Sequence, residues 1–415
     1  MGFSPSPYNS VKMYLISEEI IRGDRHDQSN AFQWTACLLN LPGTTGYNPN
    51  LSWISKRRAD NSLASDFVCF IDDQRIAGAN AERIKEAGHA LSRNQSYLGI
   101  QDALRKLRAA EGTRYPGAWA GAVVFNDEEQ GIVVLTSQDK WDQLKRICQH
   151  WLTQLDDNNT ELDHKSLRSD RGFLVYVTQA YPAMVPYLKG IHLSLETWRG
   201  GRDTEGWKLN DKIKDSDNLD YWEYEDSNIE DEDATMVQGK EAEQPPPSAP
   251  SSGITWAVPR LRSDLEALLL LSSSEKPRYR VARGRKVITA YYGFGDASSG
   301  GFGATVERPG GIHGRFGLWG RDEEDTSSNF KELLNLVQTV EEEATSGHLS
   351  HAELWLFTDN STAESCFVRG SSKSKLLHEL VLRLRKVEID YGVSLFLVHC
   401  AGTRMIAQGT DGLSR

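Results

Sequence analysis

Four acidic residues in the last third of the 415-residue sequence stand beside short apolar segments, and their order constrains the fold. Asp296 and Asp359 follow runs with the composition of β-strands, whereas Glu332 lies among apolar residues with helical spacing. Asp411 completes the set near the end of the sequence. Carboxylates at strand ends and on an adjacent helix can hold two divalent cations roughly 4 Å apart, and such pairs hydrolyse phosphodiesters. The pattern therefore predicts an α/β fold with a metal site.

Residues 288–415 carry the hydrophobic pattern of one compact α/β unit. The first three predicted strands, joined by glycine-rich turns into an antiparallel meander, are 287–294, 300–307 and 314–318. Apolar residues between Phe330 and Val340 predict a helix. The remaining predicted elements are a strand at 353–358, helices at 361–369 and 376–391, and a last strand at 393–398.

Each acidic residue alone also has an explanation that needs no metal. Asp296 begins the sequence Asp-Ala-Ser-Ser-Gly, which suits a turn in which the aspartate caps its own backbone. Glu332 is placed to complete a capping box with Asn329 as the N-cap residue. Asp411 taken singly is uninformative. The combination of all four, in this order, is more specific than any of its parts.

Asp359 is the most informative of the four residues. It follows an almost wholly apolar strand, and Ser361 with Glu364 can form a capping box for the next helix without it. In α/β sheets, ligands bind at the carboxyl ends of strands. The position of Asp359 therefore favours ligand binding over helix capping.

With these motifs identified, the sequence resembles the ribonuclease H domains of retrotransposon polyproteins. The resemblance rests on Asp296-Ala-Ser-Ser-Gly-Gly-Phe-Gly-Ala, Thr358-Asp-Asn-Ser-Thr-Ala and Asp411-Gly-Leu-Ser-Arg, with Glu332 on the intervening helix. It implies a mixed five-stranded sheet with helices on both faces. It also implies that the four carboxylates bind two Mg²⁺ ions, for which Mn²⁺ can substitute. In that family the ions activate water and stabilise the leaving oxygen as the RNA strand of an RNA–DNA hybrid is cut.

The end of the sequence adds one further candidate. His399-Cys-Ala-Gly resembles the flexible histidine loop of the same family, which is thought to aid product release. This implies a catalytic role for His399, and the alternative is a surface histidine at a strand end. Because the sequence ends four residues after Asp411, the family's last helix is expected to be missing or very short.

The first half supports a related resemblance. Phe70-Ile-Asp72-Asp73 follows a β-rich run and resembles the Tyr-x-Asp-Asp metal motif of reverse transcriptase palms, although an aspartate pair in a hairpin usually marks a turn. Residues 172–198 resemble the segment that joins polymerase to ribonuclease H. A polymerase needs another aspartate from an earlier palm strand, and the sequence begins after that point. Residues 1–210 are thus expected to be an α+β palm remnant, without DNA polymerase activity alone and with an apolar face partly exposed.

The charge of the chain is unevenly distributed. The formal net charge is −11, but residues 211–243 contain 13 Asp/Glu and 3 Lys, a net of −10. Residues 254–287 carry 8 Lys/Arg against 3 Asp/Glu, a net of +5. Phosphate contacts are predicted for the six bases of this stretch, namely Lys276, Arg278, Arg280, Arg283, Arg285 and Lys286. The acidic stretch and the Pro-rich segment after it predict a disordered linker.

These observations predict four parts: a truncated reverse transcriptase region (1–210), the linker (211–253), a basic connecting segment (254–287) and a ribonuclease H-like domain (288–415). The five scattered cysteines favour a reducing compartment, hence an intracellular protein of the cytoplasm or nucleus. No apolar run is long enough to span a bilayer.

The expected enzyme is an RNA–DNA hybrid ribonuclease. Its expected partners are nucleic acid and, by the resemblance, a missing polymerase half or other retroelement proteins. The alternative is an inactive remnant or a domesticated nucleic-acid-binding scaffold.

Overall fold

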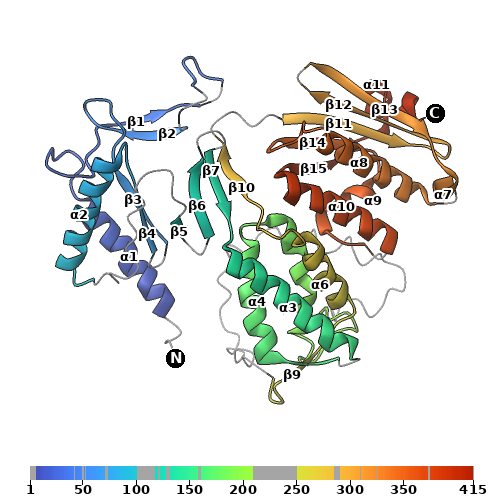
Figure 1. Cartoon of the computed structure of the whole chain (residues 1–415), viewed down its shortest axis with the longest axis horizontal. Helices are drawn as coiled ribbons and strands as arrows, with labels where there is room; N and C mark the ends of the chain where they lie inside the picture. The colour runs from blue at the N-terminus through green and yellow to red at the C-terminus, as the bar shows by residue number, and fades with distance from the viewer. Residues whose placement is uncertain are drawn as a thin grey trace, which may run out of the picture. The chain divides into compact units, whose positions relative to one another are not determined.

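The computed structural model divides the chain into two compact units, one of Met1–Lys145, Tyr176–Pro186 and Leu270–Arg415, the other of Arg146–Val175 and Tyr187–Leu269 (Figure 1). The residues described are 6–41, 43–48, 51, 53–70, 73–100, 117–119, 122–127, 131–157, 160–208, 250–284, 290–308, 310–324, 326–372 and 374–414. Most of the predicted linker, residues 211–249, lies outside them. Among these described residues, no helix has the length and apolarity needed to cross a membrane.

A five-stranded mixed sheet forms the centre of the C-terminal part of the chain. Its strands are β11 (Ala290–Ala297), β12 (Gly301–Arg308), β13 (Gly311–Leu318), β14 (Glu353–Thr358) and β15 (Ser394–His399). They run in the order β13-β12-β11-β14-β15, antiparallel through the first three and parallel from β11 through β14 to β15. This confirms the predicted α/β fold class with the mixed sheet of a ribonuclease H-like fold.

Helices lie on both faces of this sheet (Figure 1). The elements are α7 (Arg321–Glu324), α8 (Ser328–Thr345), α9 (Ser361–Arg369), α10 (Lys375–Tyr391), α11 (Gly402–Gln408) and the 3-10 helix η5 (Asp411–Leu413). On one face, a Cβ at Gly295 would lie 2.5 Å from Leu336 of α8, so glycine permits this close packing. On the other, a Cβ at Gly303 would lie 2.5 Å from Leu413 of η5. The core comprises fully buried side chains such as Leu333, Val337, Leu354 and Leu384.

The predicted elements of this part agree closely with the structure, but two predicted helix caps are wrong. Asn329 does not cap α8, because Ser327 accepts the hydrogen bond from the Phe330 amide at 3.3 Å. Ser361 and Glu364 do not cap α9, because the Asn360 side chain accepts from the Ala363 amide at 2.9 Å. The N-cap residue of α8 thus lies two positions before Asn329, and that of α9 lies one position before Ser361. β13 also begins earlier than predicted, since its pairing with β12 continues to Gly311.

The N-terminal part of the chain has a small core. Helices α1 (Ser6–Arg22) and α2 (Ala81–Tyr97) accompany two hairpins, β1 (Ala36–Leu39) with β2 (Ile54–Arg57) and β3 (Asp66–Phe70) with β4 (Asp73–Ala77). The buried core cluster is Ile21, Ala31, Phe32, Phe67, Ala87 and Leu91. Several apolar side chains are at least half exposed, including Met13, Ile16, Ile20, Leu39, Trp53 and Ile54. This agrees with the expectation of a partly exposed apolar face.

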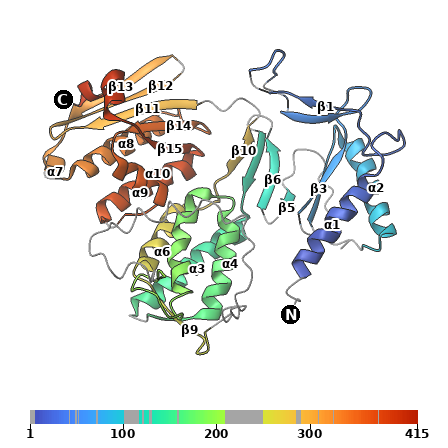
Figure 2. The same cartoon turned by 180° about the vertical axis from the view of Figure 1, so that it is seen from behind.

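The remaining elements lie between these parts in the sequence (Figure 2). Strands β5 (Gly117–Trp119), β6 (Ala122–Asp127), β7 (Gly131–Leu135) and β10 (Arg280–Gly284) form a sheet in the order β10-β7-β6-β5. The other elements are α3 (Gln138–Asp156), β8 (Glu161–Asp163), α4 (His164–Thr178), η2 (Pro182–Leu188), α5 (Lys189–Ser194), β9 (Ile254–Trp256) and α6 (Arg260–Leu271). The buried Asp264 of α6 accepts a 2.6 Å hydrogen bond from the Gly190 amide of α5.

Candidate metal centre

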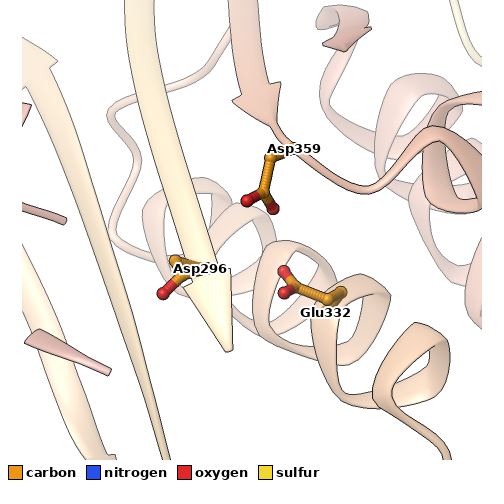
Figure 3. A group of neighbouring side chains, drawn as sticks. All are labelled: Asp296, Glu332 and Asp359. Carbon is orange, nitrogen blue, oxygen red and sulfur yellow. The ribbon is translucent and has the colours of Figure 1, made fainter. Parts of the chain in front are cut away.

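Three of the four predicted carboxylates come together at one end of the five-stranded sheet. Asp296 lies in β11, Asp359 follows the last residue of the neighbouring parallel strand β14, and Glu332 is in the second turn of α8. Each residue offers a carboxylate oxygen, and these oxygens lie within 4.8 Å of one another. Figure 3 shows the carboxylates of Glu332 and Asp359 facing the end of β11. Asp296 and Glu332 are buried, whereas Asp359 is exposed, so the cluster is open to solvent at Asp359.

Glu332 is the most perturbed member of the cluster. Burial raises its pKa to about 8, helped by the negative charges of Asp296 and Asp359 and opposed by a hydrogen bond from the Ala297 amide. Its Oε2 atom is buried and has no hydrogen-bond partner within the described part of the chain. A buried acceptor of this kind costs free energy unless a cation or a proton compensates it. An all-carboxylate set suits hard cations such as Mg²⁺, Mn²⁺ or Ca²⁺. The residues present therefore fit a divalent cation.

A buried amide fixes the end of β11 against α8. The Asn335 Nδ2 atom donates to the backbone oxygens of Asp296, at 3.0 Å, and Gly303, at 2.8 Å. Arg315 in turn donates to Asn335 Oδ1 at 3.0 Å. Sequence reasoning missed Asn335, although a signal was present: it is a polar residue inside the apolar stripe of the helix, three positions after Glu332.

A buried lysine makes a similar link. Lys331 is only 4% exposed, and its Nζ donates to the Ser299 backbone oxygen at 3.0 Å. This bond ties the turn after Asp296 to the helix residue next to Glu332. Together with Asn335, it fixes the backbone positions of two of the three acidic residues.

Asp411, the fourth predicted ligand, is described only in its backbone. It begins η5, and the turn that contains it reaches the site through Ser414, whose hydroxyl donates to Asp296 Oδ2 at 2.5 Å. The position of the Asp411 carboxylate lies outside what the structure describes, so its membership of the cluster stays a prediction.

His399 is the last residue of β15 and is paired in register with Thr358, the residue before Asp359. It is exposed, and its amide donates to Glu364 Oε1 at 3.1 Å. The position agrees both with a mobile histidine near the carboxylates and with a surface histidine at a strand end. Its catalytic role therefore stays a prediction.

The other predicted site residues are described in part. Asp72 lies outside the described residues, and only the backbone of Asp73, at the start of β4, is placed. Lys276, Arg278 and Arg280 are exposed, as phosphate-binding residues must be, and Arg278 lies 3.6 Å from Asp390. For Arg283 only the backbone is described, whereas Arg285 and Lys286 lie outside the described residues.

Comparisons with known proteins give structural matches only. No family model matches the sequence, and no curated protein matches it. RNase H1 from the halophilic archaeon Halobacterium salinarum NRC-1 is 19% identical, covering 30% of this chain and 94% of its own, with a TM-score of 0.25. An N-terminal RNase H domain from Mycobacterium tuberculosis is 15% identical, with coverages of 30% and 95% and a TM-score of 0.25. A foamy viral protease-reverse transcriptase in complex with double-stranded DNA is 11% identical, with coverages of 81% and 46% and a TM-score of 0.27.

Proposed function

We propose that this chain is a divalent-cation-dependent ribonuclease that cuts the RNA strand of RNA–DNA hybrids. One observation carries the proposal. The carboxylates of Asp296, Glu332 and Asp359 offer oxygens that lie within 4.8 Å of one another. The Glu332 carboxylate is buried, and its Oε2 atom has no hydrogen-bond partner among the described residues. Negatively charged carboxylates this close together repel one another, and a bound cation offsets that repulsion.

Asp296, Glu332 and Asp359 would hold the cation, and Asp411 is proposed as a further ligand on the basis of its motif. Bound Mg²⁺ or Mn²⁺ supplies the hydrolytic chemistry, by polarising phosphoryl oxygens and lowering the pKa of water. The protein holds acidic groups at fixed positions around that cation. The exposed side at Asp359 is proposed as the approach for the substrate phosphate, and His399 is proposed to assist product release.

The substrate would be gripped through its phosphates. The exposed bases Lys276, Arg278 and Arg280 support this proposal, which extends to Arg283, Arg285 and Lys286 of the same segment. Contacts to phosphates and to ribose hydroxyls are the usual means of recognising A-like duplexes.

We further propose that the chain derives from a retroelement, with residues 1–210 related to a reverse transcriptase palm. The proposal rests on the Asp72-Asp73 pair and on the hairpin around it, in which β3 ends at Phe70 and β4 begins at Asp73. Exposed apolar residues of α1 and of the β1–β2 hairpin would suit contact with further protein surface.

The test is a cleavage assay on an RNA–DNA hybrid, with double-stranded DNA and double-stranded RNA as controls. The parent protein should cut the RNA strand in Mg²⁺ or Mn²⁺ and not in EDTA. Asp359→Asn should lose nearly all hydrolysis but still bind the hybrid, because the side chain keeps its size and loses the charge that holds the cation. Asp139→Asn makes the same chemical change at an exposed position on α3 and should behave as the parent.

Two results would contradict the proposal. Cleavage by Asp359→Asn at the parent rate would exclude Asp359 as a ligand. Hybrid binding by a parent protein that is inert in both cations would favour the alternative, an inactive retroelement remnant or nucleic-acid-binding scaffold.

A further inference from the structure

The last residues of the described chain form a turn that is packed tightly against the sheet. α11 ends at Gln408, and Gly409 follows with a φ of +89°, which reverses the chain direction. Thr410 is fully buried, and its Oγ1 lies 3.4 Å from Oγ1 of Thr305 on β12. Ser414 is 1% exposed. The turn is thus part of the folded body.

Two glycines of β12 make room for this turn. A Cβ at Gly303 would lie 2.5 Å from the Leu413 Cβ and 3.0 Å from the Ser414 nitrogen. A Cβ at Gly301 would lie 3.0 Å from the Ser414 carbonyl oxygen. A side chain at Gly303 would force either the turn or the strand to shift, so the glycines at these positions allow Ser414 to approach the sheet this closely.

Ser414 is hydrogen-bonded both to Asp296 in β11 and to Ser298 in the turn that follows this strand. Its hydroxyl donates to Asp296 Oδ2 at 2.5 Å, and its carbonyl oxygen accepts a hydrogen bond from the Ser298 hydroxyl. An ionised carboxylate can only accept, so Ser414 is the donor in the first contact. Asn335 holds the backbone oxygen of Asp296, whereas the bond from Ser414 acts on the carboxylate itself.

We propose that Ser414 is a positioning residue that holds the Asp296 carboxylate in its cation-binding orientation. The inference rests on the proposed function, because it concerns the same carboxylate cluster. Groups that hydrogen-bond to a metal ligand orient it before the metal arrives, and their loss typically weakens metal affinity by about 10–100-fold. A link 118 residues long in sequence thus couples the turn that contains Asp411 to the oxygen atoms of Asp296.

If Ser414 only stabilised the turn, loss of either hydroxyl, that of Ser414 or that of Ser298, should weaken Mn²⁺ binding equally. A Ser298 variant therefore distinguishes a structural role of Ser414 from a positioning role. The Ser298 hydroxyl binds the same turn through the Ser414 carbonyl, and its other hydrogen bonds go to the backbone of Gly301. Ser298→Ala therefore loosens the turn and leaves the Ser414–Asp296 bond in place. Ser414→Ala removes the bond to the carboxylate and keeps the carbonyl contact with Ser298.

The experiment measures Mn²⁺ affinity of the full chain by titration calorimetry, with the melting temperature in EDTA as a measure of folding. Ser414→Ala should bind Mn²⁺ about tenfold or more weakly. Ser298→Ala should stay within about threefold of the parent, by the same scale. Ser414→Thr, which keeps the hydroxyl, should recover most of the affinity lost in Ser414→Ala.

Parent-like Mn²⁺ affinity in Ser414→Ala would overturn the inference. So would equal losses in Ser414→Ala and Ser298→Ala with equal losses of melting temperature, because the turn alone would then explain both. A parent protein that binds no Mn²⁺ would overturn the proposed function together with this inference. A parent that binds Mn²⁺ while Ser414→Ala binds it equally well would overturn this inference alone.

Discussion

The Asn360 side chain donates a 2.8 Å hydrogen bond from Nδ2 to Oδ1 of Asn329, and so joins the residue after Asp359 to the first turn of the helix that carries Glu332. The same side chain caps α9 through its Oδ1 atom, which accepts from the Ala363 amide at 2.9 Å. Asn360 therefore both caps α9 and links the segment that follows Asp359 to the helix that carries Glu332.

Asn360→Ala should destabilise the protein by about 1–2 kcal/mol, because it removes the N-cap and the link to Asn329. Asn360→Ser should cost about half as much, since serine is an equally good cap but is too short to reach Asn329. Urea denaturation followed by circular dichroism measures both. Equal losses in the two variants would mean that the cap contributes nothing.

Removal of the Glu332 charge should change the pH dependence of stability in metal-free buffer. The pKa of Glu332 is raised from 4.5 to about 8 in the folded protein. Between these values the folded state keeps a proton that the unfolded state has released, so stability falls as pH rises through this window. Glu332→Gln stays neutral and lacks this loss, so in EDTA it should exceed the parent by up to a few kcal/mol at pH about 8.

The measurement is urea denaturation in EDTA at several pH values between about 4.5 and 8. The difference between parent and Glu332→Gln should shrink toward the acid end of the series. Addition of Mg²⁺ should stabilise the parent more than the variant, because the cation binds the ionised carboxylate. Parallel pH profiles for the two proteins would show that Glu332 is not perturbed by its surroundings.

Gly303→Ala should displace the turn of η5, because the added Cβ would lie 2.5 Å from the Leu413 Cβ and 2.8 Å from its carbonyl carbon. Overpacking of this kind costs about 1–3 kcal/mol. Gly314→Ala on the neighbouring strand β13 is the matched control, since nothing lies within 4 Å of a Cβ there. Hydrogen exchange of residues 410–414 should accelerate in Gly303→Ala alone; unchanged exchange would mean that the strand yields instead of the turn.

Alanine substitutions in the basic segment should weaken binding of the RNA–DNA hybrid by reducing the electrostatic contribution to the affinity. Lys276→Ala with Arg280→Ala should lower the slope of log affinity against log salt concentration by about one for each lost phosphate contact. Fluorescence anisotropy in EDTA measures binding without cleavage. Lys85→Ala, an exposed base on α2, is the control and should leave the slope unchanged. An unchanged slope in the double variant would place the nucleic acid elsewhere.

The local elements of the C-terminal part could be predicted from the sequence, because their signals are short-range. β14 at Glu353–Thr358 and α9 at Ser361–Arg369 have the bounds that were predicted, since an apolar run and a helical apolar pattern define them. The candidate carboxylates were also identified from their neighbours in sequence. The caps were mistaken at Asn329 and Ser361 because a cap depends on which residue is the first to turn, and a shift of one residue changes it.

Tertiary structure alone decided how these pieces meet. The carboxylate oxygens of Asp296, Glu332 and Asp359 lie within 4.8 Å of one another, although these residues are far apart in the chain. The burial of Glu332 and the hydrogen bond from Ser414 to Asp296 likewise depend on contacts between distant segments. Local periodicity assigns a residue to a face or an end of its own element. Distances between elements depend on strand register and on packing at glycines such as Gly295 and Gly303, and those arise only when the whole sheet and its helices pack together.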